Sequence, residues 1–411
     1  MSSTPWQTDQ WFVSPWNFQP EVRAGLTFPP AIQFHDLTLR DGEQQAGIVL
    51  RKDEKVRIAE KLAEAGVHRI EAGIPVVSKE DEAAIREIVK RKLGPKIFAL
   101  ARCIVEDVKR AIDCGIDGCI VEIPCSEHII KYAYGWPLEK AIDMAIRATA
   151  FAHEQGVYVV FFPIDATRTD IDWYLNVIER VARDGHMDAL ALVDTTGVLS
   201  PHGAAYMAQK TRERIKDKPL ETHFHGDFGL AVANTIAALS AGCSVAHTTV
   251  LGIGERAGNA CFEETVMALK LLYGVDAGIK TGQLYSLAKL VRELTGIAVA
   301  NNKPIVGDTL FHIESGIIAD WFRNCGDEHI LEVFPWKSEV VGQAAPQVLM
   351  GKGSGQASVQ TWLDRLGLEA SPGQRMDILL KVKDASLAKK AMLTEKEFRS
   401  IVDSVLSSSK S

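Results

Sequence analysis

The chain has no long uninterrupted hydrophobic run. Its most apolar stretch, residues 157–164, is far shorter than the roughly 18 residues that suggest a membrane-spanning helix. It also has no excess of positive charge, since its 46 Lys and Arg residues are outnumbered by 53 Asp and Glu residues, which gives a net charge of −7. We therefore expect neither a membrane protein nor a general nucleic-acid binder, which would show a basic surface. The first residues have neither the basic stretch nor the apolar segment of a signal peptide.

Cysteine is sparse and follows no recognisable pattern. There are seven cysteines, none in a Cys-x-x-Cys pair, and the spacing of Cys114, Cys119 and Cys125 suits no common zinc site. We expect reduced, mostly structural thiols in a cytoplasmic protein.

The 411 residues alternate between strand-like and helix-like patterns. The predicted strands are residues 31–37, 67–74, 96–101, 118–123, 157–163, 189–193, 220–224 and 245–250. The predicted helices between and after them are residues 53–65, 80–90, 105–114, 137–155, 170–184, 202–216, 229–241 and 259–272. Eight such units in about 240 residues predict an α/β fold, a (β/α)8 TIM barrel. A doubly wound open sheet is the alternative, but it usually stops near six strands.

This pattern predicts the domain organisation. We expect an N-terminal extension over residues 1–30, whose Trp6, Trp11 and Trp16 favour packing on the body of the protein or on a partner subunit. The catalytic barrel is expected over residues 31–275. A mainly helical C-terminal subdomain over residues 276–405 and a frayed tail over residues 406–411 are expected to follow.

Polar residues follow several predicted strands, at the end of a barrel that carries chemistry. His223 and His225 close the seventh strand, and because alternate residues of a strand point the same way, they favour a metal site. Arg40 and Asp41 follow the first strand, where Asp41 can bind a cation and Arg40 can hold an oxyanion or a carboxylate. A simple surface ion pair is the alternative for Arg40 and Asp41.

A glycine-rich loop, residues 252–259, follows the eighth strand and ends in Asn259. It is not the Gly-x-Gly-x-x-Gly motif. Its position suits backbone contact with a phosphate or with a metal-bound ligand, although a plain glycine loop is also common.

Together these motifs resemble the DRE-TIM metallolyase family, and specifically its Claisen-condensing branch, which contains isopropylmalate, homocitrate and citramalate synthases. Residues 36–44, 70–75, 194–197 and 229–234 are similar to further signatures of that branch, in family order. The lyase branch has a cysteine in the loop after the last strand, and residues 254–258 contain none, which favours the synthase branch.

The resemblance implies a set of site residues. Asp41, His223 and His225 would bind one divalent cation (Zn, Mn, Mg or Co), with Asn259 as a further ligand or a neighbour of the ligands. Arg40 would be the catalytic residue that stabilises an oxyanion.

Three further residues are implied to bind substrate. Gln44 and Thr195 would hold the carboxylate or carbonyl of the substrate. Arg168 would pair either with a distal substrate carboxylate or with Asp165.

The resemblance also implies a function, a divalent-metal-dependent acyltransferase that condenses an acyl-CoA, acetyl-CoA first, with a 2-oxo acid to a malate-type 2-hydroxy acid. The alternative is a metal-dependent aldolase or lyase that cleaves a 2-hydroxy or 4-hydroxy-2-oxo acid without CoA. A homodimer is expected, whereas a C-terminal leucine-sensing domain is not.

Three departures from the family pattern leave the 2-oxo acid, the acyl donor and the direction of reaction open. Ile164 stands where the family has a substrate-side glutamate, and Ile318 and Leu331 stand where related synthases have a proton-transferring histidine and its tyrosine partner. His312 either replaces that histidine or serves packing.

Overall fold

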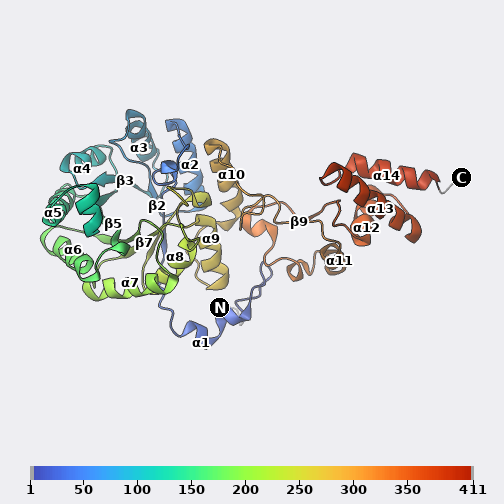
Figure 1. The fold of residues 1–411 in the computed structure, drawn as a ribbon, viewed down its shortest axis with the longest axis horizontal. Helices are drawn as coiled ribbons and strands as arrows, with labels where there is room; N and C mark the ends of the chain where they lie inside the picture. Colours follow the sequence, from blue (N-terminus) through green and yellow to red (C-terminus); the bar gives the residue numbers. More distant parts are fainter. Residues whose placement is uncertain (1–3, 409–411) are drawn as a thin grey trace. The chain divides into compact units, whose positions relative to one another are not determined.

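The computed structural model describes residues 4–408, and the chain divides into two compact units (Figure 1). One unit is Pro15–Val299, and the other combines the residues before 15 with those after 299. Each unit is described by itself below.

The first unit is built on eight parallel strands that form a closed barrel in sequence order, with β1 paired to β8. The strands are β1 (Gln33–Asp36), β2 (Arg69–Glu71), β3 (Lys96–Arg102), β4 (Gly118–Pro124), β5 (Tyr158–Ile164), β6 (Ala189–Asp194), β7 (Leu220–Phe224) and β8 (Val245–Thr248). The predicted TIM barrel is therefore confirmed. Strand β2 is shorter than predicted because the chain leaves the extended conformation at Gly73, whose φ is +145°.

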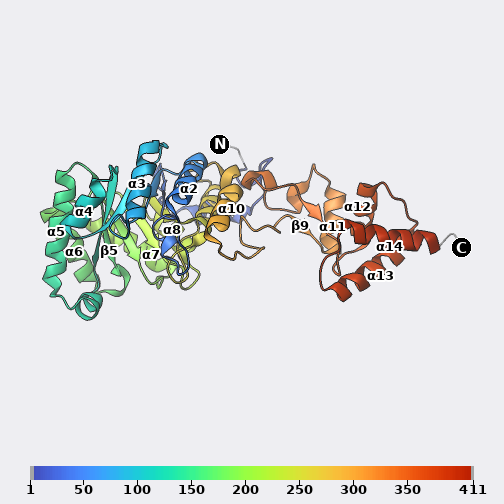
Figure 2. The ribbon, with the colours of Figure 1, turned by 90° about the horizontal axis from the view of Figure 1, so that it is seen from above.

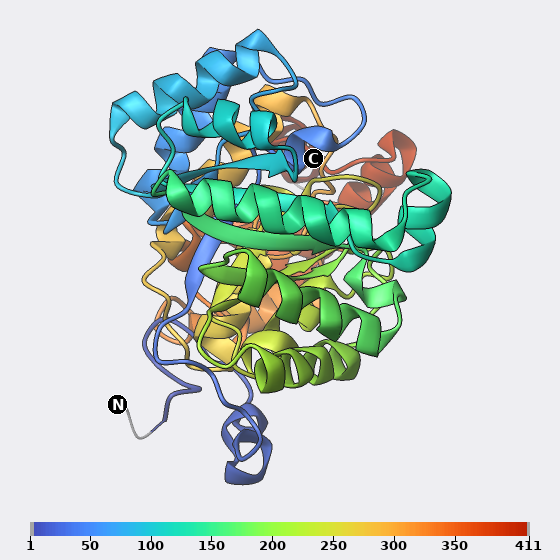
Figure 3. The same ribbon diagram turned by 90° about the vertical axis from the view of Figure 1, so that its left-hand side faces the viewer.

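Helices surround the strands, as Figures 2 and 3 show. They are α2 (Lys52–Ala65), α3 (Lys79–Arg91), α4 (Val105–Ile112), α5 (Leu138–Glu154), α6 (Ile171–Asp184), α7 (Pro201–Arg214), α8 (Ala231–Leu239), α9 (Phe262–Met267) and α10 (Leu284–Thr295). Helix α9 starts later than predicted because the backbone of Asn259 forms a β-bridge with that of His225. This bridge ties the loop after β8 to the end of β7.

Apolar side chains from alternate strand positions fill much of the barrel interior. They are Leu37, Phe98, Leu100, Ile120, Val160, Phe162, Ala189, Ala191 and Val193, all buried. A packed interior leaves the carboxyl ends of the strands as the place where polar side chains can meet a ligand.

The N-terminal residues are divided between the two units. Helix α1 (Pro20–Arg23) belongs to the barrel unit, where Arg23 Nη1 donates to the Tyr273 carbonyl at 2.9 Å. In the other unit, Trp11 forms an antiparallel bridge with Trp336, and the Phe12 amide donates to the Pro335 carbonyl at 2.9 Å.

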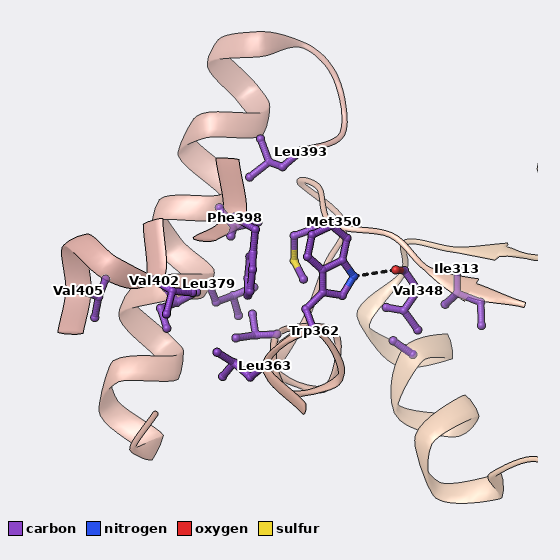
Figure 4. Close-up of a cluster of buried hydrophobic side chains, with 14 residues drawn as sticks. Ile313, Val348, Met350, Trp362, Leu363, Leu379, Leu393, Phe398, Val402 and Val405 are labelled. Atoms are coloured by element: carbon purple, nitrogen blue, oxygen red, sulfur yellow. Dashed lines mark hydrogen bonds between the residues drawn. The ribbon is translucent and has the colours of Figure 1, made fainter. Parts of the chain in front are cut away.

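Among its described residues, the second unit contains a short parallel pair of strands and four α-helices. They are β9 (His312–Ile313), β10 (Gln347–Val348), α11 (Gly316–Cys325), α12 (Gln356–Leu366), α13 (Pro372–Lys389) and α14 (Glu395–Ser408). In its core, Trp362 Nε1 donates to the Val348 carbonyl at 2.7 Å, and the Trp362 ring lies edge-on to Phe398 (Figure 4). Helix α14 includes residues 406–408, where a frayed tail was expected, and residues 409–411 lie outside the described residues.

None of the helices in the described part of the chain has both the length and the apolar character to cross a membrane.

Candidate functional site

The carboxyl end of β7 presents two histidines toward the turn that follows β1. His223 Nε2 and His225 Nε2 lie 3.2 Å apart. Asp41 Oδ2 lies 3.4 Å from His223 Nε2 and 3.5 Å from His225 Nε2. All three side chains are buried, and their ligand atoms lie within 4.8 Å of one another. The fold thus brings two imidazoles and a carboxylate together, which is a donor set for a divalent cation.

The electrostatics of this cluster suit metal binding. Burial opposes the charge on Asp41, but the Arg40 guanidinium and the His225 contact outweigh it and hold the pKa of Asp41 well below its usual range. Burial and the neighbouring His225 lower the pKa of His223. A carboxylate and a neutral imidazole are the protonation states in which these groups bind metal.

Asn259 lies at the same place. Its Nδ2 donates to the Ile253 carbonyl at 3.1 Å, and this leaves Oδ1 buried with no hydrogen-bond partner in the described part of the chain. Asp41 Oδ1 is buried and unpartnered in the same way. A Cβ on Gly254 would collide with Asn259 Nδ2 and would come within 2.9 Å of Asp41 Oδ1. Two orphaned acceptor oxygens beside a glycine that leaves room for them fit a bound cation.

Gly254→Ala is therefore expected to weaken divalent-metal affinity, on the order of tenfold or more, because the added methyl group displaces Asn259 and Asp41. A competition titration against a chelator measures this. Gly278→Ala is the matched control, since Gly278 also has a positive φ (+77°) but no atom lies within 4 Å of the position that a Cβ would take there. Equal metal affinity in the two variants would contradict the site.

Arg40 is buried beside the cluster and held by three partners. Its Nε donates to Glu71 Oε2 at 2.8 Å, and its Nη1 donates to Asp41 Oδ2 at 3.2 Å and to Gln44 Oε1 at 3.0 Å. Its Nη2 is buried without a hydrogen-bond partner among the described residues. A fixed guanidinium with one free donor can stabilise a negative charge that develops beside it.

The other predicted substrate residues form a neighbouring group at the ends of β5 and β6. Thr195 Oγ1 accepts from the Asp165 amide at 2.7 Å, and Arg168 Nε donates to Asp165 Oδ1 at 2.6 Å. Of the two partners predicted for Arg168, the structure shows Asp165. The His225 amide donates to the Asp194 carbonyl at 3.2 Å, so this group adjoins the metal ligands through the sheet.

Sequence reasoning did not single out two acids at this end of the barrel. Glu71 is fully buried against Arg40, and its pKa is raised to about 7 because burial outweighs the Arg40 charge. Glu122 interrupts the apolar strand β4, and burial raises its pKa. The sequence did contain a signal that could have identified both residues, because each is an acid inside a strand predicted to be buried.

A second buried polar group, also missed, consists of His35, Glu221 and His247. His247 Nε2 lies 2.7 Å from Glu221 Oε2, and Arg69 Nη1 donates to Glu221 Oε1 at 2.7 Å. Burial raises the pKa of Glu221, but the hydrogen bond with His247, the nearby His35 and the Arg69 charge outweigh it, so the pKa lies well below its usual range.

Comparisons with known proteins agree with this geometry. Residues 31–291 match the HMGL-like family model. The chain is 38% identical over 396 residues to the homocitrate synthase AksA of Methanothermobacter thermautotrophicus, covering 96% of this chain and 98% of that protein. It is 39% identical over 384 residues to the 2-isopropylmalate synthase of Methanocaldococcus jannaschii, and the match covers 93% of this chain and 73% of that protein.

Among solved structures, the HMG-CoA lyase of Bacillus subtilis shares the fold with a TM-score of 0.60 at 21% identity, covering 67% of this chain and 97% of that chain. The family model covers more than half of the chain, and the synthases match nearly all of it. This chain belongs to the HMGL-like family, the DRE-TIM metallolyases that its motifs resemble.

Proposed function

We propose that this protein is a divalent-metal-dependent acyltransferase that condenses an acyl-CoA with a 2-oxo acid to a malate-type 2-hydroxy acid. Acetyl-CoA is the first candidate for the acyl-CoA. The observation that carries this proposal is the buried cluster of Asp41, His223 and His225 beside an Arg40 that has one free donor. The relatives named as homocitrate and 2-isopropylmalate synthases support it, because they match 93–96% of this chain.

The metal ligands are Asp41, His223 and His225, with Asn259 Oδ1 as the fourth donor. Their mixed nitrogen and oxygen set accepts Zn, Mn, Mg or Co. When bound, such a cation polarises the ketone of the 2-oxo acid toward attack.

The side chains around the ligands have separate roles. Arg40 donates from Nη2 to the oxygen that gains charge as the new carbon–carbon bond forms. The Thr195 hydroxyl and the Gln44 amide hold the carboxylate or carbonyl of the 2-oxo acid. We assign Arg168 to holding Asp165, since that contact is already made at 2.6 Å. A cavity of about 380 Å³, lined by Arg40, Gln44 and Ile74 among others, offers space beside these groups.

A second candidate function follows from Ile318 and Leu331. Ile318 packs against the hydrophobic core of the C-terminal unit, and Leu331 lies in a short 3-10 helix, Ile330–Glu332. An aliphatic side chain cannot move the proton that leaves the acyl-CoA. These positions favour, as the alternative, a metal-dependent aldolase or lyase that acts on a 2-hydroxy or 4-hydroxy-2-oxo acid without CoA.

One assay separates the two functions. The condensation forms a carbon–carbon bond, and hydrolysis of the thioester in the condensed product then frees CoA. Release of the CoA thiol that depends on both a 2-oxo acid and a divalent metal is therefore the expected result. The same protein treated with a chelator is the control. Cleavage of a 4-hydroxy-2-oxo acid to pyruvate, with no thiol release from acetyl-CoA in the presence of any 2-oxo acid, would establish the alternative instead.

We also propose a homodimer in the cytoplasm. Large apolar side chains are exposed in both units, including Trp16 (77% exposed), Ile317 (68%) and Trp321 (52%), and a second copy would cover such surface. Light scattering is expected to give twice the chain mass of 45.0 kDa. A single-chain mass at assay concentration would contradict the dimer.

A further inference from the structure

The second buried polar group, His35, Glu221 and His247, lies inside the barrel, one layer deeper than the proposed metal ligands. Glu221 precedes His223 by two residues on β7, so the two side chains point the same way. His35 on β1 and His247 on β8 lie side by side in the strand register, where the barrel closes. The three residues of the group are at most 1% exposed, and their ligand atoms lie within 4.8 Å of one another.

The hydrogen bonding of this group is incomplete among the described residues. Neither ring nitrogen of His35 has a hydrogen-bond partner, and Nδ1 of His247 has none either. Burial lowers the pKa of His35 to about 3, so this imidazole is neutral at neutral pH and one of its nitrogens carries a free lone pair. A fully buried histidine with two unpartnered nitrogens is costly for the fold unless a ligand satisfies it.

The spacing of the donor atoms suits a small transition-metal ion. Glu221 Oε2 lies 2.7 Å from His247 Nε2 and 3.9 Å from His35 Nδ1. The ligand atoms of a tetrahedral zinc ion lie roughly 3.3 Å apart, and the two measured distances bracket that value. Two imidazoles and one carboxylate are a donor set that zinc accepts, with water in the fourth position.

We propose that His35, Glu221 and His247 form a second metal site, which binds zinc or a similar transition-metal cation. The ion joins β1, β7 and β8, which are neighbouring strands at the point where the barrel closes, so it stabilises the closed barrel. This site is separate from the proposed catalytic metal site, and it does not depend on the reaction that the protein catalyses.

Arg69 sets how tightly this second ion is held. Its Nη1 donates to Glu221 Oε1 at 2.7 Å, which leaves Oε2 to face the histidines. Arg69 also lines a cavity of about 480 Å³, together with Asp117 and Asp188 among others, and a cation that enters this cavity meets Arg69 beside Glu221. Because the guanidinium and the ion share one carboxylate, the ion is held more weakly than the proposed catalytic ion, and dialysis removes it.

Zinc titration of the chelator-treated protein, followed by calorimetry, is expected to show two ions per chain, the second bound more weakly. His35→Phe, which keeps a ring beside Phe98, should weaken the second ion by on the order of a hundredfold. Arg69→Met should tighten it by about tenfold, because the competing positive charge is gone. The double variant His223→Ala/His225→Ala should keep this second ion.

His153→Gln is the matched control, because His153 is a histidine that lines the same cavity as Arg69 but lies outside the group. It should leave both ions bound. Melting curves give a second readout. Added zinc should raise the melting temperature of the His223→Ala/His225→Ala variant, and His35→Phe on that background should remove the rise.

Zinc binding that is the same in the wild type and in a folded His35→Phe protein would overturn the inference. Loss of the second ion in His153→Gln would place that ion in the cavity and would overturn the inference as well. If the second ion binds as expected but no 2-oxo acid supports thiol release, the proposed function fails and the inference stands.

Discussion

The double variant His223→Ala/His225→Ala is expected to lose turnover and to bind divalent metal at least about a hundredfold more weakly than the wild type. Both imidazoles lie within 3.5 Å of Asp41, so their removal leaves one carboxylate and one amide oxygen for the cation. Metal content after dialysis, measured by elemental analysis, and thiol release are the two readouts.

His202→Ala is the matched control for this variant, because His202 is an exposed histidine on α7 outside the cluster. It should keep both metal and activity. Full metal occupancy in the double variant would show that the cation binds elsewhere.

Arg40→Lys is expected to lower kcat by on the order of 100- to 1000-fold with metal still bound. Lysine keeps the positive charge next to Asp41 and Glu71, but it cannot reproduce a planar group that reaches Glu71, Asp41 and Gln44 at once while leaving Nη2 free. The effect should appear mainly in kcat, since the free donor meets charge that develops during the reaction.

The alternative for Arg40 is a purely structural role. Arg183→Lys, at an exposed arginine paired with Asp184, controls for the substitution itself and should not change kcat. Near-normal kcat together with a lowered melting temperature in Arg40→Lys would establish the structural role.

The barrel could be predicted from the sequence because its signal is local and repeated. Strand β7 matches its predicted bounds, and β3, β4 and β6 differ from theirs by a single residue at the carboxyl end. Each predicted helix follows its strand in the order that a parallel barrel requires. The boundaries failed where long-range contacts decide them, as at α9, whose start is delayed by the bridge between Asn259 and His225.

Part of the metal cluster could also be predicted, because its signal is local in the sequence. Two histidines at alternate strand positions must point the same way, so the sequence alone determined that His223 and His225 act together. Their partnership with Asp41 was inferred from resemblance, since the two segments lie about 180 residues apart in the chain.

Charge balance at the site was decided only by the tertiary structure. The sequence does not show which acid, if any, pairs with Arg40, Arg102 or Arg168. The fold pairs each of these arginines with an acid. Glu122 lies beside Arg102 in the register of β3 and β4, yet the fold pairs Arg102 with Asp107. Strand and helix periods follow from the geometry of the local backbone, whereas ion pairs depend on which distant side chains meet, and that is settled only when the barrel closes.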